Sequence, residues 1–154
     1  MIGMLKKPDG TVVAVGLARP DAANLEKFRL DQFPDSENCG FIPAEELPPA
    51  QWRDCWRWDS RGVAVDMPLA RAQRLNELRA ERDGRLAKLD GQWMRAMGQK
   101  NSTEADNIEA KRQLLRDIPQ MLTGDRARDG ACVVSTLADC KTPEDLGALE
   151  PAWP

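Results

Sequence analysis

The sequence predicts an α+β protein: a small N-terminal lobe built on β-hairpins, then a long helix that forms an antiparallel helical hairpin, then a short C-terminal helix. Three observations predict this class. Short apolar runs alternate with Pro and Gly turns over the first 65 residues. Residues 67–98 carry apolar side chains at helical spacing. Aromatic residues make up only 5% of the chain, so the core must be mainly aliphatic, which favours helix packing over a β-sandwich.

We expect three parts: a lobe of residues 1–65 with two hairpins, a helical hairpin of residues 66–122, and a loop with a C-terminal capping segment over residues 123–154. In the lobe, two apolar runs flank the turn tripeptide Pro8-Asp9-Gly10, which predicts a hairpin of residues 1–6 and 11–16. Asp21 can cap a short helix that carries Leu25 and Phe28 at helical spacing. Prolines follow at positions 34, 43, 48 and 49, so we expect an irregular connector there.

The stretch "CWRWDSRGVAVDMP", residues 55–68, predicts a second hairpin. Trp56 and Trp58 share one face of a strand, residues 59–62 form a turn, and Val63 and Val65 share a face of the return strand. Cross-strand pairs of Trp with Val would hold such a sheet together. We therefore interpret the tryptophans mainly as scaffold that seats the long helix on the lobe; a platform for stacking bases or sugars is the alternative.

A helix of residues 67–98 follows, with Asp66 as its cap and Pro68 in its first turn. At 1.5 Å per residue it would be about 50 Å long, which exceeds what a 65-residue lobe can cover. Part of it must therefore meet another helix or another chain, and a homo-oligomer through this helix is one possibility. We expect partner contacts, within the chain or beyond it, at the apolar side chains of this helix and at the tryptophan near the C-terminus: Leu75, Leu78, Leu86, Leu89, Trp93, Met97 and Trp153.

The sequence "GQKNSTEAD" predicts the end of that helix and the start of another over about residues 103–118, ending near Pro119. Because the connection is short, the two helices should lie antiparallel. The stretch "ACVVSTLADC" fits a strand or a helix equally well. Thr142 as N-cap and Pro143 at the first helical position predict a short terminal helix.

Composition argues against most enzyme classes. The chain has no histidine, which removes Ser-His-Asp, Cys-His and HExxH sets, and it has no glycine-rich phosphate loop. We therefore expect a protein that is not an enzyme, with no cofactor and no metal. The four cysteines lack CxxC spacing; we interpret Cys39, Cys55, Cys132 and Cys140 as small, mostly buried thiols, with a Cys132–Cys140 bridge as a minor alternative.

The charge pattern argues against nucleic acid and membranes as partners. The net charge is −3, and only the segment 66–98 is basic, with seven basic and five acidic side chains. Glu81–Arg85 and Arg79–Asp83 are opposite charges one turn apart, so a salt-bridged face is the simpler interpretation of this helix. No run is long and apolar enough to span a bilayer, and the N-terminus lacks the apolar core of a secretory signal, so we expect a cytoplasmic protein.

Several motifs together resemble a family of small phage and prophage proteins encoded among tail genes, many of them described as tail fibre assembly chaperones. The resemblance covers residues 47–122 and the last dozen, although Cys55 stands where the family has Ala, the segment 123–141 is longer, and Gly147 and Pro151 interrupt the closing helix. The matching positions are Trp52, Arg53 and Trp56; Val65, Asp66, Met67, Ala70 and Arg71; Arg79, Arg82, Leu86, Leu89, Asp90, Trp93, Met94, Arg95 and Ala96; Gln113, Leu115, Arg116, Asp117 and Pro119; and Thr142, Pro143, Glu144, Leu146, Trp153 and Pro154.

The resemblance implies a protein without catalysis that binds tail fibre or other tail subunits during assembly in the host cytoplasm. Fibre proteins expose apolar seams before they trimerise, and a helical hairpin could cover such seams. A structural virion component at the baseplate or fibre attachment site is the alternative, and a prophage regulator that binds nucleic acid is a weaker one.

Overall fold

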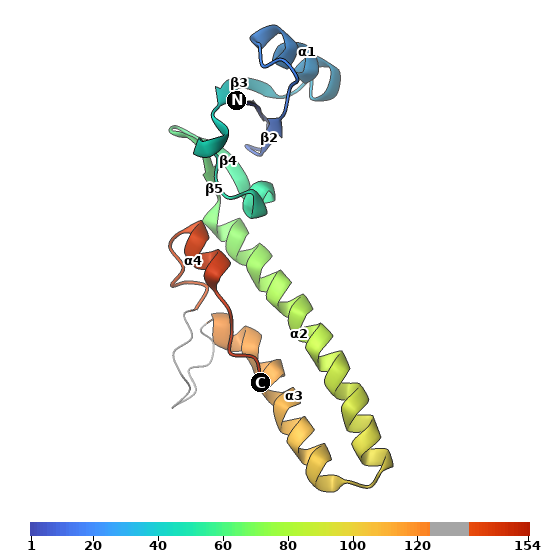
Figure 1. Cartoon of the computed structure of the whole chain (residues 1–154). Helices are drawn as coiled ribbons and strands as arrows, with labels where there is room; N and C mark the ends of the chain where they lie inside the picture. Colours follow the sequence, from blue (N-terminus) through green and yellow to red (C-terminus); the bar gives the residue numbers. More distant parts are fainter. Residues whose placement is uncertain (124–135) are drawn as a thin grey trace. The chain divides into compact units, whose positions relative to one another are not determined.

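The structure, a computed structural model, describes residues 1–123 and 136–154, and its architecture is the predicted α+β class (Figure 1). The chain divides into two compact units, Met1–Ala70 and Arg71–Pro154. The first unit contains a three-stranded sheet, a helix and a two-stranded sheet. The second contains a helical hairpin and a short terminal helix.

The sheet of the first unit contains the predicted N-terminal hairpin. Strands β1 (Ile2–Lys6) and β2 (Val12–Val15) pair antiparallel. At their turn, Gly10 has a φ of 81° and Asp9 accepts a hydrogen bond from the backbone N–H of Thr11 at 2.9 Å. Met4 and Leu5, adjacent in β1, are both fully buried. Since successive strand residues face opposite sides, both faces of this sheet are covered.

A third strand, β3 (Glu37–Ile42), completes the sheet in the order β2-β1-β3, and the prediction of an irregular connector is wrong for this segment. The segment "ENCGFI" lacks the apolar alternation that predicts strands. Its pairing with β1 shifts register between Gly3 and Leu5, and Gly40 in β3 has a φ of 83°. Pairing with β1, which is distant in the sequence, therefore determines that this segment is a strand. Beyond it the chain is irregular as expected, with short 3-10 turns η1 (Ala44–Glu46) and η2 (Ala50–Cys55).

Helix α1 (Ala22–Gln32) covers one face of this sheet, and its predicted cap is confirmed. Asp21 accepts a hydrogen bond from the backbone N–H of Asn24 at 2.8 Å. Leu25, which is fully buried, packs with Leu5, Val15 and Phe28 between helix and sheet.

The second hairpin, β4 (Trp56–Asp59) and β5 (Gly62–Val65), covers the other face and has the predicted register, with Trp56 opposite Val65 and Trp58 opposite Val63. Trp56 packs with Met4 and Val12, and Trp58 lies partly buried against the same cluster. Trp52 and Trp56 are each only 2% exposed. These two tryptophans are therefore core residues of the first unit.

Helix α2 (Met67–Gly98) has the predicted bounds, and Asp66 accepts a hydrogen bond from the backbone N–H of Leu69 at 3.2 Å. A tight turn ends it: Lys100 has a φ of 55°, its N–H bonds to the Met97 carbonyl, and the N–H of Asn101 bonds to the Ala96 carbonyl. This is the hydrogen-bond pattern of a Schellman motif, which satisfies carbonyls at the helix end.

Helix α3 (Ser102–Thr123) packs antiparallel on α2, and it extends five residues past the predicted end. Pro119 lies inside the helix although proline lacks an N–H for the helical ladder. Leu115, Ile118, Pro119 and Leu122 are all buried. Packing therefore carries the helix beyond the proline.

The C-terminal helix α4 (Pro143–Ala148) has the predicted start. The Thr142 side chain and the Asp145 side chain form a reciprocal capping box, and Leu146 is fully buried. Of the ambiguous stretch 131–140, residues 131–135 lie outside the described part of the chain, and Thr136–Cys140 form a turn. Cys132, and with it the Cys132–Cys140 alternative, also lies outside the described residues.

Candidate partner-binding groove

The second unit carries an apolar groove between helix α3 and the segment that follows α4. Its volume is about 290 Å³. Ile118 and Leu122 are buried there, whereas Leu114 is 49% exposed. The described residues that line it are all apolar: Leu114, Ile118, Met121, Leu122, Pro151, Ala152, Trp153 and Pro154. These residues offer a ligand apolar area and carry no charge.

One wall of the groove is a C-terminal strap, which we define as residues 149–154. Arg74 on α2 donates a hydrogen bond from Nη2 to the carbonyl oxygen of Leu149 at 2.7 Å, and Leu149 and Pro151 are buried. The guanidinium carbon of Arg85 lies 4.5 Å from the ring centroid of Trp153, within the range of a cation–π contact. The strap is thus held to α2 at two points.

A second, more polar hollow of about 530 Å³ lies along α2 and also reaches the strap. Arg85 and Lys88 contribute cations to it, and Glu81 contributes a carboxylate 2.7 Å from Nη2 of Arg85. Leu115 of α3 and Pro154 of the strap complete its lining. Because Pro154 lines both hollows, the strap separates the apolar groove from the polar one.

Several of the apolar side chains predicted on α2 pack inside the second unit. Leu78 is buried, and Leu89 and Trp93 pack against a cluster of Ala96, Ala105 and Ile108 between the two helices. The expectation that the helix meets another helix is therefore met by α3. Leu75 and Leu86 are half-buried.

Met97 departs from the packed face, since it is 51% exposed and its neighbour Ala96 is buried instead. Two small side chains, Ala96 and Ala105, form the contact near the turn. Trp153 lies half-buried in the groove wall. That any of the predicted residues contacts another molecule remains a prediction.

Trp153 is the one residue of this lining among the partner contacts predicted from the sequence; the groove residues on α3 and the rest of those in the strap were not predicted. Leu114, Ile118 and Leu122 recur at four-residue intervals, a signal that was available. Ending the helix near Pro119 left Met121 and Leu122 out of that stripe.

An ionic cluster joins the two long helices of this unit. Arg112 of α3 pairs with Asp90 of α2 at 2.7 Å and with Glu109 of its own helix, and its guanidinium lies 5.4 Å from the Trp93 ring centroid. Arg116 donates a hydrogen bond to Glu109 at 2.8 Å. This bond, with the nearby charges of Arg112 and Arg116, holds the pKa of Glu109 below its usual value.

Several basic side chains of α2 bind groups of the chain itself. Arg71 donates to the carbonyl of Cys140 at 2.9 Å, Arg82 pairs with Asp83, and the predicted Glu81–Arg85 pair is present at 2.7 Å. Asp83 thus pairs with the adjacent Arg82, whereas the sequence predicts a pair of Asp83 with Arg79. These contacts favour a salt-bridged face over a track for phosphates.

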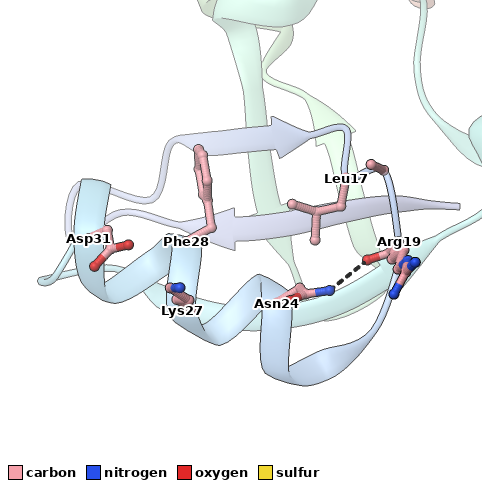
Figure 2. A pocket seen from close by; sticks show the side chains of 7 residues that line it. Leu17, Arg19, Asn24, Lys27, Phe28 and Asp31 are labelled. Atoms are coloured by element: carbon pink, nitrogen blue, oxygen red, sulfur yellow. Dashed lines mark hydrogen bonds between the residues drawn. The ribbon is translucent and has the colours of Figure 1, made fainter.

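A further hollow of about 420 Å³ lies on the first unit beside α1 (Figure 2). Leu17 and Phe28, which belong to the core under α1, form its apolar part. Figure 2 shows the Asn24 amide pointing to the carbonyl of Arg19, to which it donates a hydrogen bond at 3.3 Å. Its charged residues, such as Lys27 and Asp31, are exposed, so this hollow offers no buried polar group for a ligand.

Over residues 1–123 and 136–154, no three Cys, Asp or Glu side chains are grouped to hold a metal ion. Within the same ranges no helix is long and apolar enough to span a membrane. Cys55 and Cys140 are buried and Cys39 is half-buried. Burial raises the pKa of the Cys140 thiol, and the charge of Asp145 adds to the effect.

Comparison of the chain with protein-family models, with curated proteins and with solved structures finds no match.

Proposed function

We propose that this protein is a phage tail assembly protein that acts by binding, without catalysis, and that it holds tail fibre or other tail subunits through the apolar groove of its second unit. The observation that carries the proposal is the groove itself. Its lining, over the part of the chain that the structure describes, is apolar, and it is open at Leu114, which is 49% exposed. Apolar pockets that take up an apolar or aromatic side chain of a partner are a feature of surfaces that bind other proteins.

The positions that resemble the tail-gene family support the proposal. One motif lies on α3 from Gln113 to Pro119, and another begins at Thr142 and closes with Trp153 and Pro154. The groove lies where these two segments meet, because α3 and the strap form its opposite walls. A partner that exposes an apolar seam before it assembles would find matching chemistry there.

The test is co-expression with a tail fibre subunit from the same phage genome, followed by measurement of the soluble fibre protein that co-purifies. Leu114→Asp places a charge in the groove without emptying a buried site. We expect it to reduce co-purification at least tenfold. Leu30→Asp is the matched control, since Leu30 is 56% exposed and belongs to α1 of the first unit, whereas the groove belongs to the second. It should leave co-purification unchanged.

Two results would contradict the proposal. If the unaltered chain retains no fibre or other tail subunit, the proposed function is wrong. If the Leu114→Asp and Leu30→Asp variants retain the subunit equally, the contact lies elsewhere on the protein.

Mass spectrometry of purified particles and of lysate separates an assembly protein from a virion component. An assembly protein is abundant in the lysate and absent from particles. A polypeptide present in particles at a fixed copy number is a structural component of the tail.

A further inference from the structure

We propose that the C-terminal strap, residues 149–154, is a latch: it closes the space between α2 and α3, and it must move aside for a partner to occupy the full groove. The inference rests on the proposed function for the partner, while the latch itself follows from the contacts of the strap.

The strap has a fixed end and a weakly held end. At the fixed end, α4 is closed by its capping box, Leu146 is fully buried, and Leu149 receives the hydrogen bond from Arg74. After Leu149, none of the hydrogen bonds found among the described residues involves positions 150–154. Pro151 is buried as well, whereas positions 152–154 are exposed or half-buried, so the strap should open most readily after Pro151.

Among the described residues, the directed contact that holds the weakly held end is that of Arg85 with Trp153. Its geometry is prepared by Glu81, which lies one turn before Arg85 and holds the guanidinium at 2.7 Å. The Arg85 side chain is itself 41% exposed, and cation–π contacts at exposed sites are weak. This contact can therefore hold the strap closed and still yield to a competing ligand.

Opening of the strap would change the surface of both hollows at once. Pro154 lines both hollows, and Leu115, now 1% exposed, lines the polar one. Movement of the strap would merge the hollows into one groove between α2 and α3. That groove would have an apolar side on α3 and the cations Arg85 and Lys88 on α2.

Acrylamide quenching of Trp153 fluorescence tests the latch without any partner. The signal of Trp153 is the difference between the unaltered chain and its Trp153→Phe variant. We expect Arg85→Gln to raise the quenching constant of Trp153 at least twofold. Arg82→Gln is the matched control, because Arg82 lies on the same helix and pairs with Asp83. It should leave the quenching constant unchanged, and circular dichroism should show equal helix content in all variants.

Nile red supplies a second readout that is insensitive to the lost charge, since the dye is neutral. Its emission should rise at least twofold with Arg85→Gln and stay unchanged with Arg82→Gln. The latch is overturned if Trp153 of the unaltered chain is quenched as fully as a free tryptophan derivative, because the strap then is not closed. It is also overturned if Arg85→Gln changes neither quenching nor Nile red emission.

Repeating the fibre co-purification with Arg85→Gln links the latch to function. We expect more fibre subunit retained per chain than with Arg82→Gln. Equal retention would overturn the role of the latch in binding while leaving the proposed function in place. If the unaltered chain binds no tail subunit, the proposed function is wrong. The latch is then tested by the quenching experiment alone.

Discussion

The guanidinium of Arg112 lies 2.7 Å from the carboxylate of Asp90 and thereby joins helix α3 to helix α2 by an ion pair. The Asp90 side chain is 54% exposed, so solvent screens this pair. Arg112 has two further contacts, with Glu109 and with the ring of Trp93. The arginine should therefore matter more to stability than the aspartate.

We expect Arg112→Met to lower the free energy of unfolding by about 1–2 kcal/mol, since it removes an ion pair and a cation–π contact but keeps an apolar stem. Asp90→Asn should cost about 0.5 kcal/mol. Urea unfolding followed by circular dichroism measures both changes, and the double variant gives their coupling. Equal costs for the two single variants would show that the contacts with Glu109 and Trp93 contribute nothing.

Gly3 is a position where even a methyl group should cost stability. A Cβ there would lie 2.7 Å from Cδ1 of Leu25, which is fully buried against the sheet. Gly3→Ala should therefore destabilise the protein by about 1–3 kcal/mol, as overpacking of cores does. Gly16→Ala is the control, because a Cβ at that position meets nothing within 4 Å. Thermal unfolding should show a clear loss for the first variant and none for the second.

Lys100 is a site where glycine should be better than the natural residue. Its φ of 55° is left-handed, which disfavours residues with a Cβ. Lys100→Gly should raise the free energy of unfolding by about 1 kcal/mol. Lys111→Gly, inside α3, should lower it by about as much because glycine weakens helix interiors. If both variants lose stability, the turn after α2 does not hold Lys100 in the left-handed conformation.

The carboxylate of Glu109 is predicted to give the helical hairpin a dependence on pH. Its pKa is held below the usual 4.5, first by the hydrogen bond from Arg116 and then by the charges of Arg112 and Arg116. A carboxyl group whose pKa is lowered by folding contributes stability above its ordinary pKa, and that stability is lost as the pH falls through the lowered value.

Arg116→Gln should raise the pKa of Glu109 toward 4.5, as measured by NMR titration of the side-chain carboxyl carbon. Glu26 is an internal control, since its lowered pKa depends on Arg29 and Asn38 in the first unit. Its titration should be the same in both proteins. An unchanged pKa of Glu109 in the variant would contradict the role of Arg116.

Elements whose signals are local could be predicted from the sequence. The register of Trp56 with Val65 follows from period-two alternation around a two-residue turn. The start of α4 follows from Thr142 and Pro143, and the start of α2 from Asp66. In each case the residues that determine the structure are neighbours in sequence.

What could not be predicted depends on contacts between distant residues. Strand β3 forms because β1 offers an edge to it, and its own sequence lacks a strand pattern. Pro119 stays within α3 because buried neighbours on both sides keep the helix packed. The groove unites α3 with residues some thirty positions later, and the sequence alone leaves open whether Trp153 contacts its own chain or a partner.

The central position of β1 also has a consequence for synthesis on the ribosome. Its pairs Ile2 with Ile42 and Gly3 with Phe41 form only after residue 42 has left the exit tunnel. At roughly 5–20 residues per second, the edge of β1 that will pair with β3 stays unpaired for a few seconds. An open edge is the feature through which nascent chains pair wrongly with one another. The risk of such mispairing at β1 thus arises before the helical unit has been made.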